Sequence, residues 1–175
     1  MIYLDNSATT KVHDDVLASF IQVNNQYYGN AASIHAMGVE SNDLLTRARM
    51  QVAQLVYAEP ENVIFTSGGT ESNNFAFYGV AAASKHKGRH IITTAVEHPC
   101  VLEAAKRLQQ QGYEVDYLSV NAQGVISLEE LRDKIRKDTV LVSIMHVNNE
   151  MGAIMPIQQS AAIIHDNSRA VFHVD

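Results

Sequence analysis

The sequence predicts an α/β fold, with a mostly parallel sheet and flanking helices. From residue 63 onward, short apolar runs alternate with amphipathic stretches of helical period, which is the pattern of successive strand–helix–strand units. The run at 140–144 is apolar apart from one serine, as expected of a strand buried on both faces. The 175 residues suffice for one domain with a sizeable core and are too few for two ordinary domains.

Helices dominate before this alternation begins. Apolar residues recur at helical spacing over 14–27 and again over 37–57, so we expect one amphipathic helix in each range. Pro60 then ends helical structure and precedes an apolar run at 63–66, which predicts a short strand.

Turn and capping residues separate the later elements. Gly112 ends one helical stretch, and Ser127 with Glu130 forms a capping-box pattern at the start of another. The expected strands lie at 91–94, 115–120, 140–144 and 171–174, and the expected helices at 70–84, 101–111, 127–136 and 157–166.

Composition excludes several classes of function. The net charge of −6 argues against a nucleic-acid-binding surface. No apolar run approaches the roughly 18 residues of a membrane span, and the first residues lack the features of a secretory signal. The single cysteine, Cys100, cannot form an internal disulfide, so we expect a reducing compartment, the cytoplasm. The histidine spacing predicts no metal site.

Parallel sheets bind ligands at the carboxyl ends of their strands, and polar residues cluster there in this sequence. After the 63–66 run, Gly69 and Thr70 stand at the start of a helix, where free amides and the helix dipole favour a phosphate. An ordinary glycine-rich turn with Thr70 as the helix cap explains the same residues.

Three further clusters follow the later strands. His98 could stack on an aromatic ligand or move protons, or simply cap the next helix. Asn149 could donate a hydrogen bond to a phenolate or carboxylate, or serve only in a turn. Asp175, at a strand end, could pair with a pyridinium nitrogen or an arginine, or cap a helix. Together the four clusters match the needs of pyridoxal phosphate.

These segments closely resemble the cysteine desulfurases, a group within the class V, fold-type I pyridoxal-phosphate enzymes. The resemblance covers the whole chain in the family's order. Its motifs are Tyr-Leu-Asp-Asn-Ser-Ala-Thr-Thr at 3–10, Gly-Asn-Ala-Ala-Ser-Ile-His at 29–35, Phe-Thr-Ser-Gly-Gly-Thr-Glu-Ser-Asn at 65–73, Glu-His at 97–98, Ser-Ile-Met-His-Val-Asn-Asn-Glu-Met-Gly at 143–152 and His-Val-Asp at 173–175.

The resemblance implies a role for each candidate residue. Gly69 and Thr70 would hold the phosphate of pyridoxal phosphate, and His98 would lie over the ring and take part in proton transfer. Asn149 would reach the phenolic oxygen, and Asp175 would pair with the ring nitrogen. Residues 1–13 would pack on a small domain absent from this chain, and residues 14–175 would form part of the cofactor-binding large domain.

The resemblance also defines what this sequence lacks. Family members are substantially longer, and their cofactor-binding lysine, in a Ser-x-His-Lys segment, follows the His-Val-Asp motif. Their nucleophilic cysteine and their substrate-binding arginine also lie beyond the stretch that matches. We therefore expect the N-terminal part of a desulfurase, truncated before the last strands of its sheet, with the 63–66 strand deprived of its usual neighbour. Cys100, at the start of a helix, is interpreted as structural rather than as a replacement nucleophile.

The leading functional prediction is a cysteine desulfurase, which converts L-cysteine to L-alanine and leaves sulfur as an enzyme persulfide for iron–sulfur or thio-cofactor assembly. The 175 residues alone are predicted inactive, with noncovalent binding of pyridoxal phosphate at best. A selenocysteine lyase or another fold-type I lyase is the alternative within the class. A non-catalytic interaction fragment that pairs with a full-length relative is the alternative outside it. Expected partners are a second copy or the missing half, and a sulfur-acceptor protein.

Overall fold

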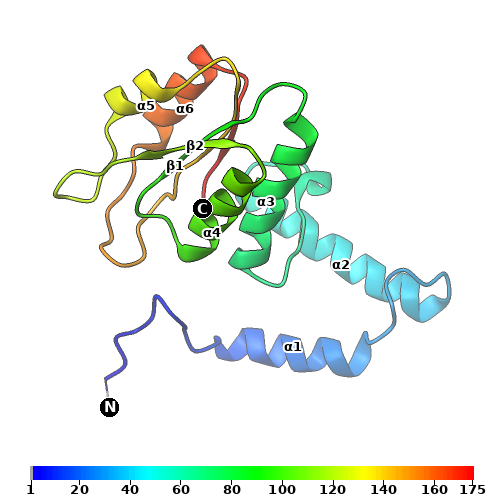
Figure 1. The fold of residues 1–175 in the computed structure, drawn as a ribbon. Coiled ribbons are helices and arrows are strands. Elements are labelled where there is room, and N and C mark those ends of the chain that lie inside the picture. The colour runs from blue at the N-terminus through cyan, green and yellow to red at the C-terminus, as the bar shows by residue number, and fades with distance from the viewer. Residues whose placement is uncertain (1) are drawn as a thin grey trace. The chain divides into compact units, whose positions relative to one another are not determined.

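The structure, a computed structural model, describes residues 2–175 and divides into two compact units, residues 1–65 and 66–175. The first unit contains helix α1 (Asp14–Gln26), helix α2 (Ala36–Leu55) and the short 3₁₀ helix η1 (Pro60–Asn62). Both predicted helices are present, and α2 ends two residues earlier than expected. The remaining elements belong to the second unit (Figure 1). Met1, at the start of the predicted 1–13 segment, lies outside the described residues.

The first unit buries little of its own surface. Helix α1 has no buried residue, although Val16, Phe20 and Val23 recur along it at helical spacing. Helix α2 buries only Gly38, Ser41 and Ala53. The expected amphipathic pattern is therefore present, but the apolar side chains of α1 remain exposed.

Residues 63–66 were predicted to form a strand, and this prediction is wrong. The segment has no regular structure and pairs with none of the described strands. A strand requires a neighbour to satisfy its backbone groups, and here the Arg49 side chain donates to the Val63 carbonyl instead. The Arg49 guanidinium also lies 5.1 Å from the centroid of the Phe65 ring.

The second unit is built on a four-stranded parallel sheet in the order β2-β1-β3-β4. The strands are β1 (His90–Thr94), β2 (Glu114–Leu118), β3 (Thr139–Ser143) and β4 (Val171–His173). The two central strands, β1 and β3, are buried at every residue. The predicted α/β class, the four later strands and their parallel pairing are confirmed, with boundaries displaced by one or two residues.

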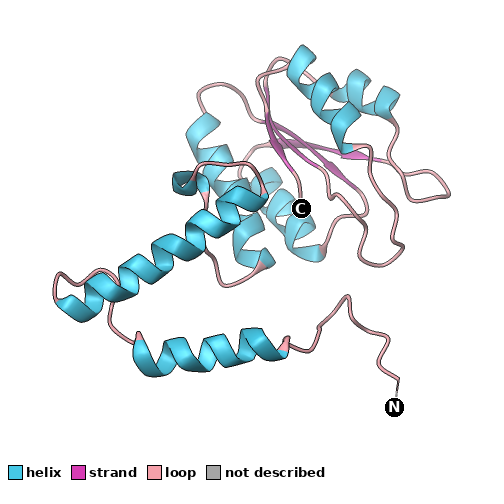
Figure 2. Ribbon diagram, turned by 180° about the vertical axis from the view of Figure 1, so that it is seen from behind, coloured by secondary structure: helices cyan, strands magenta, loops and turns pink. Residues whose placement is uncertain are grey.

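Helices cover both faces of this sheet (Figures 1 and 2). Helices α3 (Gly69–Ser84) and α4 (Pro99–Gln110) pack on one face, where Phe77, Val101 and Leu141 share a core. Helices α5 (Leu128–Lys134) and α6 (Ile157–Asn167) pack on the other, around Leu131 and Val142.

Local signals explain where these helices begin and end. Gly112, at φ 88°, follows the end of α4, a backbone conformation that glycine adopts without strain. Ser127 caps α5 by accepting from the Glu130 N–H, 3.2 Å away. The capping box is only half formed, because the Glu130 carboxylate accepts from Ser119 instead.

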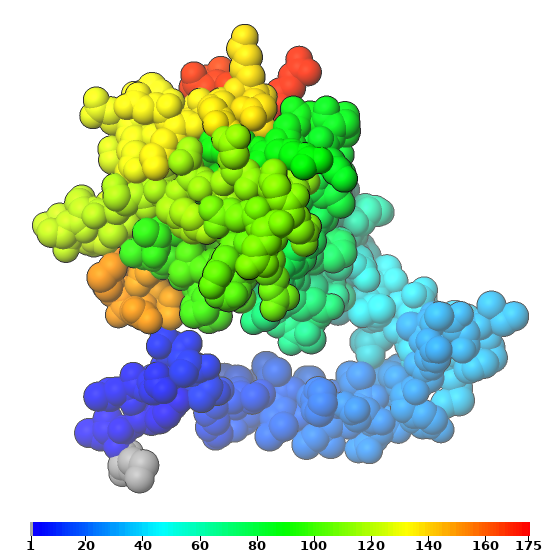
Figure 3. Space-filling view, in the orientation of Figure 1, coloured from blue at the N-terminus to red at the C-terminus, as the bar shows by residue number. Residues whose placement is uncertain are grey.

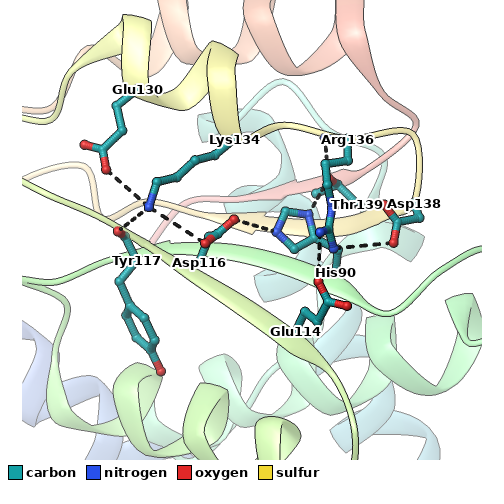
Figure 4. A network of polar contacts seen from close by, with 9 residues as sticks. All are labelled: His90, Glu114, Asp116, Tyr117, Glu130, Lys134, Arg136, Asp138 and Thr139. Atoms are coloured by element: carbon teal, nitrogen blue, oxygen red, sulfur yellow. Dashed lines mark hydrogen bonds and ion pairs between the residues drawn. The ribbon is translucent and has the colours of Figure 1, made fainter.

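A network of hydrogen bonds and ion pairs links three strands near their amino ends (Figure 4). His90 is buried, and its Nε2 lies 3.1 Å from Asp116 Oδ2 on β2. A carboxylate only accepts, so Nε2 carries the proton and Nδ1 accepts from the Thr139 hydroxyl of β3 at 2.8 Å. Burial lowers the pKa of His90. This network lies at the opposite end of the sheet from the polar clusters predicted to bind a ligand.

No helix within residues 2–175 is both long enough and apolar enough to span a membrane.

Candidate functional site

The strand order reverses direction between β1 and β3. From β1 the chain moves outward to β2, and from β3 it moves outward in the opposite direction to β4. The connections that leave the two central strands therefore lead to opposite edges of the sheet. In open parallel sheets this reversal point is where ligands bind. The loop after β1 holds His98, the loop after β3 holds Asn149, and Asp175 follows β4.

The first turn of α3 is open. Its N-cap is Gly68, without a side-chain cap, so the alternative in which Thr70 caps the helix is wrong. A Cβ added at Gly68 or Gly69 would meet no atom within 4 Å, which leaves room for a ligand beside the backbone. Because the first amides of a helix have no intrahelical acceptor, the turn with Gly69 and Thr70 suits an anion.

Glu71 stabilises this turn through the residue that precedes its glycines. Its Oε2 accepts from the Ser67 N–H at 2.6 Å and from the Ser67 hydroxyl at 2.7 Å. These hydrogen bonds, the backbone one first, lower the pKa of Glu71.

His98 is the N-cap of α4 and is exposed. Its Nδ1 accepts from the Cys100 N–H at 3.2 Å, which confirms the capping interpretation. A backbone N–H can only donate, so Nδ1 has no proton and the neutral ring carries its proton on Nε2. The cap therefore fixes the tautomer and leaves the Nε2–H for a ligand or proton transfer.

Cys100 joins the starts of two helices. Its Sγ lies 2.9 Å from His98 Nδ1 and accepts from Asn73 Nδ2 at 3.3 Å. Asn73 lies one helical turn after Thr70, so this contact brings the first turn of α3 beside the first turn of α4. The half-buried thiol thus has packing and hydrogen-bonding contacts at the place where a structural residue was expected.

Two adjacent asparagines have different surroundings in the loop after β3. Asn148 is buried and forms the turn, because its Oδ1 accepts from the Glu150 and Met151 amides at 3.0 and 2.8 Å. Its Nδ2 donates to the Val96 carbonyl at 3.0 Å and links this loop to the loop after β1. Asn149 is exposed, and the loop reaches the surface (orange in Figure 3).

Asp175 is attached to the same edge through its backbone. Its carbonyl accepts from the His146 N–H at 2.9 Å. Its carboxylate is exposed and has no ion pair with any cation in residues 2–175. The sequence suggested a buried strand end, but this short edge strand leaves the carboxylate accessible.

Glu97 lies directly before His98, and its sequence context alone gave it no separate role. It is 5% exposed, and its Oε1 accepts from the Thr94 hydroxyl and the Met145 N–H, both at 2.9 Å. Burial raises the pKa of Glu97 to about 7, and the negative charge of Asp175 adds to the effect. The sequence signal that could have identified Glu97 is its position as an acidic residue shortly after an apolar strand.

The predicted residues therefore share one edge of the second unit. Links between loops and helix starts bring the segments together, but no hydrogen bond among residues 2–175 joins Thr70, His98, Asn149 and Asp175 to one another. Four polar groups that remain available at one edge suit a ligand with a phosphate, an aromatic ring and a basic ring nitrogen. No group of three or more metal-ligating side chains exists in the described part of the chain.

Known proteins share this sequence and fold. Residues 2–175 match the family described as Aminotransferase class-V. The mitochondrial cysteine desulfurase of Saccharomyces cerevisiae is 47% identical over 99% of this chain and 35% of its own length. Cysteine desulfurase 2 of Trichormus variabilis is 47% identical over 100% of this chain and 44% of its own length.

Solved structures of related proteins have the same fold. A NifS-like protein superposes with a TM-score of 0.94 at 42% identity, covering 97% of this chain and 47% of its own. A structure of SspA in complex with cysteine gives a TM-score of 0.89 at 35% identity, covering 97% and 48%. This chain spans less than half the length of these relatives. The match over residues 2–175, at this identity and with this parallel sheet, shows that the chain belongs to the aminotransferase class-V family.

Proposed function

We propose that this chain supplies the noncovalent part of a pyridoxal-phosphate site in a cysteine desulfurase. The observation that supports the proposal most is the grouping of His98, Asn149 and Asp175 around the point where strand order reverses. The family is pyridoxal-phosphate dependent, and the similarity to named cysteine desulfurases extends over nearly the whole chain.

The residues fit this cofactor. The uncapped first turn of α3, with open space beside Gly68 and Gly69, suits the phosphate. The exposed, unpaired carboxylate of Asp175 suits a protonated ring nitrogen. When bound, pyridoxal phosphate supplies an electron sink for bonds at the substrate α-carbon.

Each residue then has a defined task. The Gly69 and Thr70 amides bind the phosphate, and Asn149 donates to the phenolic oxygen. His98 would contact the ring and would move a proton through Nε2, because its Nδ1 accepts from the Cys100 N–H. Asp175 keeps the ring nitrogen protonated by ion pairing. Stacking of the imidazole also excludes water from the ring face that it covers.

The substrate proposed is L-cysteine, because one related structure contains cysteine in complex with that protein. The full reaction gives L-alanine and a persulfide sulfur for an acceptor protein in iron–sulfur or thio-cofactor assembly. It requires a lysine, a cysteine and an arginine that the resemblance assigns to residues beyond the matched stretch. We therefore propose that the 175 residues alone bind the cofactor without turnover. Selenocysteine lyase is the nearest alternative activity.

A non-catalytic role in pairing with a second chain is favoured by one separate observation. Helix α1 buries none of its residues and exposes Phe20 and Ile21, at 65% and 52%, which is typical of an unpartnered surface. A homodimer, or association with a full-length relative, would cover these side chains. Size-exclusion chromatography with and without a full-length desulfurase tests this role, and absence of co-elution refutes it.

Binding and turnover are tested separately. Titration of pyridoxamine 5′-phosphate, which has no aldehyde to react with lysines, followed by calorimetry, is expected to give saturable binding that Asp175→Asn weakens roughly tenfold. Asp166→Asn, at an exposed position on α6, is the matched control and is expected to bind as the wild type does. Alanine formation from L-cysteine is expected to stay at the level of free cofactor. Binding that is indifferent to Asp175→Asn, or clear turnover, refutes the proposal.

We also propose a cytoplasmic location. The single cysteine supports a reducing compartment, whereas several relatives are named as mitochondrial. Cell fractionation with a mitochondrial marker decides between the two, and recovery with the marker refutes the proposal.

A further inference from the structure

One buried acid at this edge has no part in the function proposed above. Glu97 is the only acidic side chain among the buried residues of the described chain. Its Oε1 accepts two hydrogen bonds, whereas its Oε2 is buried without a partner. Burial of a carboxyl group with one oxygen unpaired destabilises the folded state. We therefore asked what the position of Glu97 contributes to the site.

Glu97 links two loops at the point where the strand order reverses. The residue pairs of β1 and β3 end at Ile92 and Val142. Beyond them, Glu97 in the loop after β1 accepts from the Met145 N–H at the start of the loop after β3. The second connection between these loops is the hydrogen bond from Asn148 to the Val96 carbonyl. Glu97 therefore continues the attachment of β1 to β3 where the strands no longer pair.

Both connected loops hold residues of the proposed site. His98 directly follows Glu97, and Asn149 lies four residues after Met145. A displacement of one loop would change the separation of the imidazole and the amide. The hydrogen bond from Met145 thus bears on the geometry of two ligand-binding groups that do not contact each other.

Burial and one nearby charge shift the ionisation of Glu97. Burial is the larger cause of its raised pKa, and Asp175, after β4, raises the pKa further. The adjacent segments also hold His98 at the start of α4, His146 and Glu150 in the loop after β3, all three exposed, and the half-buried His173 on β4. When two carboxyl groups lie near each other, the buried one retains the proton more readily than the exposed one. Glu97 therefore holds its proton at a higher pH than an ordinary glutamate does.

We infer that Glu97 is a positioning residue, whose carboxyl group holds the His98 loop against the Asn149 loop and, while it is protonated, adds no negative charge beside Asp175. The identity of the ligand in this inference rests on the function proposed above. The inference adds that Glu97 sets the relative position of two loops of that site. A neutral carboxyl still accepts from Met145 through its carbonyl oxygen, so the attachment persists in both protonation states.

The attachment is tested first without ligand. Amide exchange of Met145 is measured by NMR in the wild type, Glu97→Gln and Glu97→Leu, with Glu129→Gln on α5 as an exposed control. Gln retains an acceptor oxygen and is expected to protect Met145 as the wild type does. Leu has no acceptor, and exchange is expected to be roughly tenfold faster. Unchanged exchange in Glu97→Leu, or loss of protection in Glu97→Gln, overturns the inference.

A second measurement does not depend on the folding of the Leu variant. The Glu97 carboxyl carbon is titrated by ¹³C NMR in the wild type and in Asp175→Asn. Removal of the nearby negative charge is expected to lower the pKa of Glu97, and an unchanged titration contradicts the influence of Asp175 on Glu97.

Ligand binding gives the third readout. Pyridoxamine 5′-phosphate, which has no aldehyde to react with lysines, is titrated at about pH 6 and about pH 8. The ratio of the Kd of Glu97→Gln to that of the wild type is expected to be near one at the lower pH and to change several-fold at the higher, where only the wild type gains a second negative charge. A ratio independent of pH overturns the charge role. Failure of the wild type to bind refutes the proposed function only, because the exchange and titration measurements are made without ligand.

Discussion

The buried carboxyl of Glu97 predicts an unusual pH dependence of stability, which Glu97→Gln should abolish. Burial raises the pKa from the ordinary value of 4.5 to about 7 in the folded chain. The folded state therefore binds more protons than the unfolded state between these values. The free energy of unfolding then falls as pH rises through this window. The wild type retains the full contribution below about pH 4.5 and loses it as pH passes about 7.

The size of this effect follows from the two pKa values. A difference from 4.5 to about 7 corresponds to about 3 kcal/mol. Glutamine is neutral at every pH and keeps the acceptor oxygen for the Met145 N–H. The variant should therefore gain stability relative to the wild type by about 3 kcal/mol between about pH 4.5 and about pH 8.

Urea unfolding followed by circular dichroism at several pH values measures the difference. The comparison of variant with wild type cancels the titration of all other groups. Glu129→Gln controls for the loss of an exposed charge and should show no such trend. Unfolding free energies that run parallel for Glu97→Gln and the wild type across the window would refute the reasoning.

Further predictions concern the rest of the second unit. His90→Leu should lower the free energy of unfolding by about 1–2 kcal/mol near neutral pH. It should also reduce the loss of stability on acidification, because burial lowers the pKa of His90 and unfolding below about pH 6.5 therefore takes up a proton. Unfolding free energies measured at several acidic pH values check both effects. Gly88→Ala should destabilise the fold by more than about 1 kcal/mol, since the added Cβ would overlap the Asp138 carbonyl. Gly79→Ala, in open space on α3, should instead stabilise the fold by about 0.5–1 kcal/mol. Thermal unfolding of the two variants and the wild type measures both effects. Asn148→Ala should accelerate exchange of the Glu150 and Met151 amides by about tenfold, measured by NMR.

Periodicity and turn residues were sufficient to predict most of the second unit. All four later strands form where expected, the two central ones fully buried, and Gly112 and Ser127 mark helix boundaries where expected. Residues 63–66 have the composition of a strand but lack a partner within the described residues. Strand formation depends on pairing, which a local pattern does not specify.

The candidate site was predictable at the level of loops but not of individual contacts. Polar residues at strand ends indicated which side chains would gather at one edge of the sheet, because parallel strands share one carboxyl edge. Sequence alone could not distinguish Asn148, which is buried in a turn, from Asn149, which is exposed. Nor could it assign the burial of Glu97, which depends on the approach of Met145 from a different segment.

A single ring site shared by four segments is the central claim, and mapping of pyridoxamine 5′-phosphate by NMR tests it directly. Amide shifts in the ¹⁵N-labelled chain are recorded during titration with the phosphate ligand, with inorganic phosphate as the comparison. Saturable shifts are expected at Thr70, His98, Asn149 and Asp175 with a single Kd, and inorganic phosphate should reproduce only those near Thr70. Shifts scattered over the surface, or different Kd values for the four positions, would contradict the shared site.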